Sequence, residues 1–479
     1  MDMRTAPQAL AAGRRGDTVI GIGTGGAFGI VVGALSNVHS IWSSAAMVVA
    51  VVITAAAFIR LLGPNVGLVV LLIVACLLDR GTFKVGSFNI RAEQVAALLT
   101  LAVLGITRFS ARRTLWLRPS LAEAALAAWF GVGLIGSLTA APSRGESLKV
   151  LALLVLSALG LVLPPRVLER RRKELDEVVR WLLLAVAAEG AYTVLAYFLH
   201  WVGPVVSSSF NPGTNLLSAY GTLWEPNVLG AVSAAGAVGW LFLGRVHFKH
   251  SWLGVALCLS ATIVSFTRAA WLAGALVIVL LLAINNSRQI NLRFLARRVV
   301  PALALIGVLI IGILAVGDKI GGSSKGRLTD LSRTIGNGTD ILGRLGQFNT
   351  VLTDLKQNPV FGGGIDSYGQ RHMFNGSPEH IANLELAVVN DTGLLGLLIF
   401  AAFAALVIVT VWRHRLDSTV IGLAAMTLVI ALTNQATETL ELMITWLLVG
   451  LLLAAIGTAA PINASAAARI TPDSDLRPA

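Results

Sequence analysis

The stretch that decides the fold reads WLGVALCLSATIVSFTRAAWLAGALVIVLLLAI, residues 252–284. It consists of two long apolar runs with a single arginine, Arg268, near their junction. A helix that crosses a lipid bilayer needs roughly 20 predominantly apolar residues. The stretch therefore predicts two neighbouring membrane spans, and it raises the question of why a permanent positive charge stands at the edge of both.

The composition of the whole chain also indicates a membrane protein. Of its 479 residues, 56% are hydrophobic and 13% are charged, whereas about 25% of the residues of a soluble protein are charged. The 37 lysines and arginines outnumber the 25 acidic residues, but most lie in segments between apolar runs. They indicate membrane orientation and not nucleic-acid binding. Cys76 and Cys258 lie in apolar runs, which predicts buried side chains without disulfide or thiol chemistry.

The apolar runs predict an all-α, polytopic membrane helix bundle of about fourteen transmembrane helices. Their centres lie near residues 27, 50, 71, 101, 130, 156, 190, 236, 259, 276, 308, 400, 425 and 450. The first run follows several arginines without a cleavage site, which predicts an uncleaved signal-anchor. Strict alternation from a cytoplasmic N-terminus puts most basic residues inside, as the positive-inside rule requires. We therefore expect a multi-pass protein of the cytoplasmic (inner) membrane with both termini in the cytoplasm.

This topology divides the chain into five predicted regions. They are a cytoplasmic N-terminal segment (1–17), a transmembrane bundle of about eleven spans (18–317), an extracytoplasmic loop (318–388), three C-terminal transmembrane helices (389–460) and a cytoplasmic tail (461–479). The loop is too long for a mere connection and is expected to be functional.

Within the loop, an apolar stripe at helical spacing predicts an amphipathic helix at the outer face. Its members are Leu342, Leu345, Phe348, Leu352 and Leu355. Thr339 or Asp340 is expected to cap the start of the helix, and Asn358-Pro359 is expected to end it.

Arg268 is the first candidate site residue. Arginine in or near hydrocarbon is costly and is usually paired or functional. Its guanidinium binds phosphate through two parallel hydrogen bonds, so we interpret Arg268 as a cation for an anionic headgroup. An arginine that merely anchors a helix end by snorkelling is the alternative.

The long loop adds candidates on the same side of the membrane. Arg344 lies in the predicted amphipathic helix, and Arg371 follows the cluster Gly362–Gly364, whose glycines are expected to allow close backbone approach to a ligand. His380 precedes the re-entry into the membrane and is a candidate general base, with His372 as a competitor. A solvated loop histidine is the simpler interpretation of either.

Three more polar residues lie at or within predicted spans. Glu225 and Asn227 stand where the span centred near 236 begins, and are expected to line a donor or acceptor site. Glu189 lies in the middle of a predicted span. Acids inside a membrane are often functional, and a hydrogen-bonded contact between helices is an equally good interpretation.

Four segments, in order, resemble the superfamily of O-antigen ligases and O-antigen polymerases. They are GTLWEPNVLG (221–230) with its Pro-Asn pair, SFTRAAWL (265–272) with Arg-x-x-x-Leu, Arg344 with NPVFGGGIDSYG (358–369), and HIANLELAVVNDTGLLGLL (380–398). Their order and spacing agree from about residue 220 to 460, whereas the N-terminal half agrees only in being polytopic. One departure concerns the base: the histidine of the family falls on Ala382, next to Asn383 and two residues after His380, and Asp391 replaces the usual glutamate.

The resemblance implies a membrane glycosyltransferase with a GT-C-like helical fold that needs no metal ion or other cofactor. Its donor would be a glycan on a polyprenyl diphosphate and its acceptor a hydroxyl of a glycan or lipid, at the outer face of the membrane. Arg268 and Arg344 would stabilise the diphosphate, and His380 would act as the base. The other substrate-binding positions would be Glu225, Asn227, Arg371 and Asn383. Ligase and polymerase stay open, because they differ in the acceptor.

A transporter or flippase of lipid-linked saccharides is the main alternative. It predicts paired internal repeats, broken helices and charges at mid-membrane, of which the sequence offers only Glu189 and no repeat. A non-catalytic scaffold of envelope assembly would not need two arginines and a histidine on one face of the membrane.

Overall fold

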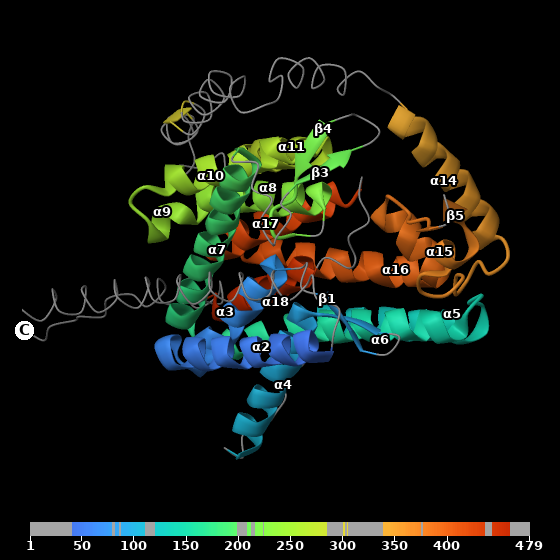
Figure 1. Cartoon of the computed structure of the whole chain (residues 1–479), viewed down its shortest axis with the longest axis horizontal. Coiled ribbons are helices and arrows are strands. Elements are labelled where there is room, and N and C mark those ends of the chain that lie inside the picture. The colour runs from blue at the N-terminus through green and yellow to red at the C-terminus, as the bar shows by residue number, and fades with distance from the viewer. Residues whose placement is uncertain are drawn as a thin grey trace, which may run out of the picture.

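A computed structural model shows a predominantly helical chain (Figure 1). It describes residues 41–78, 82–85, 88–110, 120–198, 208–211, 216–223, 225–284, 300–301, 304, 339–374, 377–435 and 443–459. The predicted span centres near 27 and 308, the N-terminal segment and the C-terminal tail lie outside these residues.

Apolar helices occupy the other twelve predicted span centres. They are α2 (Ile41–Leu62), α3 (Pro64–Leu77), α4 (Ala92–Ser110), α5 (Leu121–Thr139), α6 (Arg144–Val162), α7 (Arg172–Phe198), α8 (Pro226–Phe242), α10 (Ser251–Val264), α11 (Arg268–Ile284), α16 (Leu384–Arg413), α17 (Ser418–Thr433) and α18 (Met443–Thr458). Among the described residues, α5, α6 with the turn after it, α7 and α16 are long and apolar enough to cross a membrane, and the others are shorter apolar helices. A helical membrane protein is thus indicated, and the number of spans stays a prediction.

Shorter elements connect these helices. The helical ones are the 3-10 helix η1 (Pro164–Leu168), α9 (Gly244–His247), α14 (Thr339–Leu355) and α15 (Ser367–Arg371). Three antiparallel hairpins pair β1 (Thr82–Val85) with β2 (Phe88–Arg91), β3 (Ser208–Asn211) with β4 (Leu216–Ala219), and β5 (Met373–Phe374) with β6 (Ser377–Pro378). The all-α prediction omitted these hairpins, because each is short and lies between helices, where apolar periodicity gives no signal.

Helix α8 forms the centre of one part of the bundle, where α7, α10, α11 and α17 pack around it (Figure 1). It is buried from Val228 to Phe242. Small residues allow this close packing: a Cβ on Gly236 would lie 2.3 Å from the side chain of Val186, and one on Gly239 would lie 2.6 Å from the sulfur of Met426. A bulky, polar-faced helix could not fill this position.

The second part of the bundle is built on α5 and α16, which lie along each other (Figure 1). The buried Trp129 of α5 donates its indole N–H to Thr392 Oγ1 of α16 at 3.2 Å and packs its ring against Phe400. Farther along α16, Leu398 turns outward, as Leu272 does on α11; their side chains are 68% and 72% exposed. Such exposed leucines suit a surface that faces lipid.

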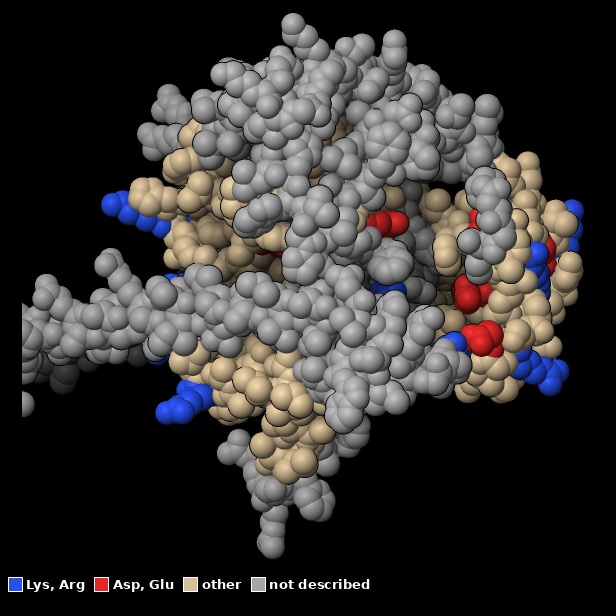
Figure 2. Space-filling view, in the orientation of Figure 1, with Lys and Arg blue, Asp and Glu red and all other residues tan. Residues whose placement is uncertain are grey.

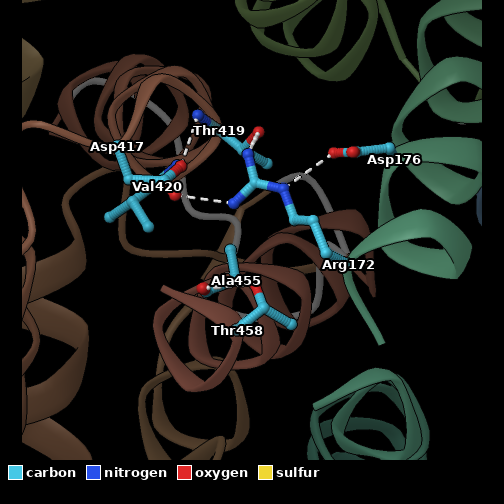
Figure 3. A network of polar contacts seen from close by, with 7 residues as sticks. All are labelled: Arg172, Asp176, Asp417, Thr419, Val420, Ala455 and Thr458. Carbon is cyan, nitrogen blue, oxygen red and sulfur yellow. Dashed lines mark hydrogen bonds and ion pairs between the residues drawn. The ribbon is translucent and has the colours of Figure 1, made fainter. Parts of the chain in front are cut away.

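Charged side chains gather toward opposite ends of the molecule. Figure 2 shows most of those visible on one face over α9 at one end, and over α14 and the turn between α5 and α6 at the other. In the predicted topology, the α9 end of the molecule is the cytoplasmic end. There, Arg172 of α7 contacts α17 (Figure 3). Its guanidinium lies 2.6 Å from Asp417 Oδ2, 2.5 Å from Thr419 Oγ1 and 3.1 Å from Asp176 Oδ1.

Asp417 also caps the first turn of α17, because its Oδ1 accepts the backbone N–H groups of Thr419 and Val420 at 2.8 and 3.2 Å. Burial alone would raise the pKa of Asp417, but the hydrogen bond from Arg172 and the two backbone bonds outweigh it, so its pKa is lowered. A carboxylate with a lowered pKa stabilises the fold above its ordinary pKa, and this stabilisation is lost as the pH falls.

We predict that Asp417→Asn lowers the free energy of unfolding in detergent by about 1 kcal/mol at neutral pH, because the ion pair and part of the helix cap are lost. The difference from wild type should shrink as the pH falls through and below the ordinary aspartate value of about 3.9. Thermal unfolding followed at several pH values tests this. Asp176→Asn is the control, since it contacts Arg172 without capping a helix; an equal effect of both variants at all pH values would contradict the prediction.

Candidate functional site

The structure brings three of the predicted site residues together at the start of two helices. Arg268 is the first residue of α11, and Glu225 and Asn227 flank Pro226, the first residue of α8. The link is Thr267, whose hydroxyl donates to the Pro226 carbonyl oxygen at 2.9 Å. All three predicted residues are partly exposed, so they are accessible to a ligand at this place.

The turn that presents Arg268 is strained and tightly held. Phe266 has a φ of 54°, a left-handed conformation that is a true outlier for a bulky residue. Thr262 holds both sides of the turn, because its carbonyl oxygen accepts from Ser265 Oγ at 2.7 Å and from the Trp271 indole at 2.8 Å. Strain of this kind persists only where the surroundings impose it, and it is common at functional sites.

This arrangement favours an anion. The first backbone N–H groups of a helix have no partner within the helix, and the helix dipole makes this end positive. Here the N-termini of α8 and α11 meet through Thr267, beside the permanent charge of Arg268. A helix N-terminus and a guanidinium are features that bind phosphate.

A second group of predicted residues is organised by a break in α16. Gly393, inside this helix, has a φ of 66° and a ψ of −170°. The next N–H groups leave the helical pattern and donate to the loop instead: Leu394 N–H to the Pro359 oxygen at 2.9 Å, and Leu395 N–H to the Val360 oxygen at 3.2 Å. The loop and the helix therefore share backbone hydrogen bonds.

The loop also donates to the helix. Gly363 N–H binds the Asn390 oxygen at 2.7 Å, and Gly364 N–H binds the Asp391 oxygen at 3.0 Å. The carboxylate of Asp391 accepts the N–H of Asp366 at 3.1 Å. Segment 359–366, which we call the wedge loop, is thus inserted into the break of α16.

The predicted role of Gly362–Gly364 is wrong in one respect. We expected these glycines to allow a ligand to approach, but the space beside them is filled by the protein itself. A Cβ on Gly362 would lie 2.5 Å from the Gly393 nitrogen, and one on Gly364 would lie 2.9 Å from Ser137 Cα of α5. The glycines allow the wedge loop to approach α16 and α5, which sequence reasoning could not distinguish from approach to a ligand.

Arg371 and His372 follow the wedge loop and share one partner, Asp354 of α14. His372 Nε2 lies 2.9 Å from Asp354 Oδ2, and Arg371 Nη1 lies 3.6 Å from the same oxygen. The ring of Tyr368 packs on His372 with 4.5 Å between centroids. Burial, followed by the charges of Glu379 and Asp354, raises the pKa of Tyr368, so its hydroxyl stays protonated. The contact with Asp354 orients the imidazole ring of His372, and general bases are often oriented by a carboxylate in this way.

His380 is exposed and stands just before α16. Its carbonyl oxygen accepts from Gln347 Nε2 of α14 at 3.1 Å, and the same nitrogen donates to Glu379 at 2.9 Å. Asn383 caps α16 by accepting the Leu386 N–H at 2.9 Å. Gln347 and Asp354 were not predicted as site residues, because only the folded chain shows that α14 holds both histidine segments.

Helix α14 begins at Thr339, one of the two predicted cap residues, and ends at Leu355, three residues before the predicted end. Its stripe is not buried as a unit: Phe348 and Leu352 are exposed, whereas Val351, outside the stripe, packs fully buried against Tyr368 and Ile381. The side chain of Arg344 lies outside the described residues, so its place is known only as a position in α14.

The two groups lie in different parts of the bundle. Figure 2 shows a hollow between the part built on α8–α11 and the part built on α14–α16, with acidic and basic side chains visible inside it. Helix α17 connects the two parts: it packs on α8 and α11, and the Asn434 carbonyl oxygen after its last turn accepts the Leu384 N–H of α16. Among the described residues, no three His, Cys, Asp and Glu side chains gather as metal ligands would.

We predict that Gly362→Ala unfolds or strongly destabilises the protein, by about 1–3 kcal/mol or more, because a Cβ there meets the α16 backbone and the residue has a positive φ. Gly346→Ala in α14 is the matched control, since a Cβ there meets nothing within 4 Å and alanine favours a helix. The midpoint of thermal unfolding in detergent distinguishes them. A Gly362→Ala protein as stable as wild type would show that the wedge loop is not held as described.

Comparison with known protein families assigns part of the chain. A family model described as O-antigen ligase matches residues 253–401, a segment that includes the Arg268 turn, α14, the wedge loop and the break in α16. No curated protein matches the chain. The family match confirms the superfamily that the sequence motifs indicated: residues 253–401 correspond to the O-antigen ligase family of membrane enzymes.

Proposed function

We propose that this protein is a metal-independent membrane glycosyltransferase that moves a glycan from a polyprenyl diphosphate to an acceptor hydroxyl at the outer face of the inner membrane. The observation that supports this most is that the O-antigen ligase match includes Arg268 at the point where two helix N-termini converge. A diphosphate leaving group is an anion that such a place stabilises.

In this proposal, Arg268 and Arg344 neutralise the diphosphate as the bond from the sugar anomeric carbon to its oxygen breaks. The acceptor oxygen forms the new bond to that carbon and gives its proton to a base. Glu225 and Asn227 bind substrate beside Arg268, and Arg371 and Asn383 bind it near the loop. The diphosphate is then stabilised by the two arginines, whose positive charge does not depend on a bound metal ion.

The base is proposed to be His380, because it is exposed at the entry to α16, where an acceptor can reach it. His372 stays the competitor, since Asp354 orients its ring. The two histidines lie in segments that α14 holds through different side chains, Gln347 and Asp354. Separate substitutions can therefore distinguish them.

Deletion of the gene, followed by analysis of surface glycan, tests the function. Loss of glycan attachment indicates a ligase, and loss of long chains with single units retained indicates a polymerase. Lipid-linked saccharide that accumulates on the inner side would instead indicate a flippase and contradict the proposal.

We predict that Arg268→Lys lowers glycan transfer by roughly 10- to 100-fold, because lysine keeps the charge and loses the two parallel hydrogen bonds to phosphate. Arg413→Lys, an exposed arginine in the last turn of α16, should transfer like wild type. Transfer by wild type should also survive EDTA. Full activity of Arg268→Lys, or strict dependence on Mg²⁺ or Mn²⁺, would count against phosphate stabilisation by arginine.

We predict that His380→Ala lowers transfer by about 100-fold or more, since general-base catalysis contributes roughly 10²–10⁴-fold, and that His372→Ala has a smaller effect. The measurement is transfer rate at saturating donor, with folding checked by thermal unfolding. The reverse order of the two variants would move the base to His372.

A further inference from the structure

Glu189 is a buried acid in the middle of α7 that the proposed reaction does not use. Its side chain is 6% exposed. Oε1 accepts the N–H of Thr222 at 2.9 Å and the hydroxyl of Thr193 at 3.2 Å, and Oε2 lies 2.6 Å from the Thr222 hydroxyl. Both carboxyl oxygens thus contact one turn of the chain, Gly221-Thr222, which follows β4.

This turn fits the carboxyl group closely. Gly221 has a φ of 61°, and a Cβ there would lie 2.0 Å from Glu189 Oε1 and 2.4 Å from Thr193 Oγ1. The Thr222 hydroxyl also lies 2.5 Å from the carbonyl oxygen of Leu77, the last residue of α3. The turn is therefore fixed between α3 and α7.

The hydrogen-bond arrangement needs a donor at position 189. Thr222 carries one hydroxyl proton but faces two oxygens, the Leu77 carbonyl and Glu189 Oε2. A protonated carboxyl satisfies both contacts, because it donates to Thr222 while Thr222 donates to Leu77. A glutamine at 189 can do the same through its amide N–H, and still accept the Thr222 N–H through its oxygen.

The fixed turn leads directly into the first group of the site. Segment 221–227, of which Trp224 lies outside the described residues, leads from the turn after β4 into the first two residues of α8 and contains Glu225 and Asn227. Glu189 holds its beginning, and Thr267 holds its end through the Pro226 oxygen. The second anchor precedes Arg268 by one residue, so the two anchors together set where Glu225 and Asn227 stand relative to that arginine.

We propose that Glu189 is a positioning residue: by holding Gly221 and Thr222 it places Glu225 and Asn227 beside Arg268 for binding of the lipid-linked diphosphate. This inference rests on the proposed function. Its action is through hydrogen bonds and not through a charge, so glutamine replaces it and alanine does not. In a transporter that used Glu189 as a mid-membrane charge, glutamine would not replace the glutamate, because glutamine removes the charge.

The test uses full-length protein in detergent–lipid micelles and a sugar-free polyprenyl diphosphate as the probe. The apparent Kd is measured from the dose dependence of the thermal unfolding midpoint. Wild type and Glu189→Gln should bind alike, and Glu189→Ala should bind roughly 10- to 100-fold more weakly, since misplacement by about 1 Å has effects of this size.

Ser157→Ala is the matched control, because Ser157 is a buried, hydrogen-bonded residue of α6 that contacts Gln94 and not the 221–227 segment. It should lower the midpoint without changing the Kd, as any purely structural loss would. If Glu189→Ala does not fold, Thr222→Val, which removes only the hydroxyl contacts, should weaken binding in the same direction.

The outcomes separate the two proposals. An unchanged Kd in Glu189→Ala overturns the positioning role and leaves the proposed function intact. The same holds for Thr222→Val when Glu189→Ala does not fold. Loss of binding in a folded Glu189→Gln also overturns it. Failure of wild type itself to bind the polyprenyl diphosphate overturns the proposed function, and the positioning role with it.

Discussion

The shared hydrogen bonds between the wedge loop and the broken helix α16 are the constraint on which the second half of the site depends. Inside a membrane, backbone polar groups must find partners within the protein. The break at Gly393 frees N–H groups and carbonyl oxygens, and residues 359–364 supply their partners on both sides. A helix can therefore be broken here at little cost, and the break in turn fixes the loop.

What is fixed in this way is the set of side chains that follow the loop. Arg371 ends α15, the short helix after the loop, His372 follows it, and Asp354 of α14 binds both. The same helix, about two turns earlier, holds the His380 segment through Gln347. The described part of the long loop, from residue 339 onward, is thus held as a unit, because α14 and the wedge loop both pack on α16.

The sequence predicted the positions of the apolar helices because their length and composition are local properties. It also placed Arg268, Glu225 and Asn227 on one side of the membrane, and the Thr267 contact brings them together. It could not predict that Gly362 and Gly364 face protein, or that Gln347 and Asp354 organise the histidines. Those facts depend on contacts between segments far apart in the chain, and the exposed positions of Phe348 and Leu352 depend on them too.

The two groups of the site are held in different ways, and this difference bears on the choice between ligase and polymerase. The Arg268 group is part of the buried bundle around α8, with a strained Phe266 and anchors on α3, α7 and α10. Its charge is permanent and its geometry is set before any ligand arrives, which is what the proposed binding of a diphosphate would require. The His380 group is exposed and reaches the bundle through a loop. In the proposed function, ligase and polymerase share the donor and differ in the acceptor, so we expect the residues that separate the two activities to belong to this second group.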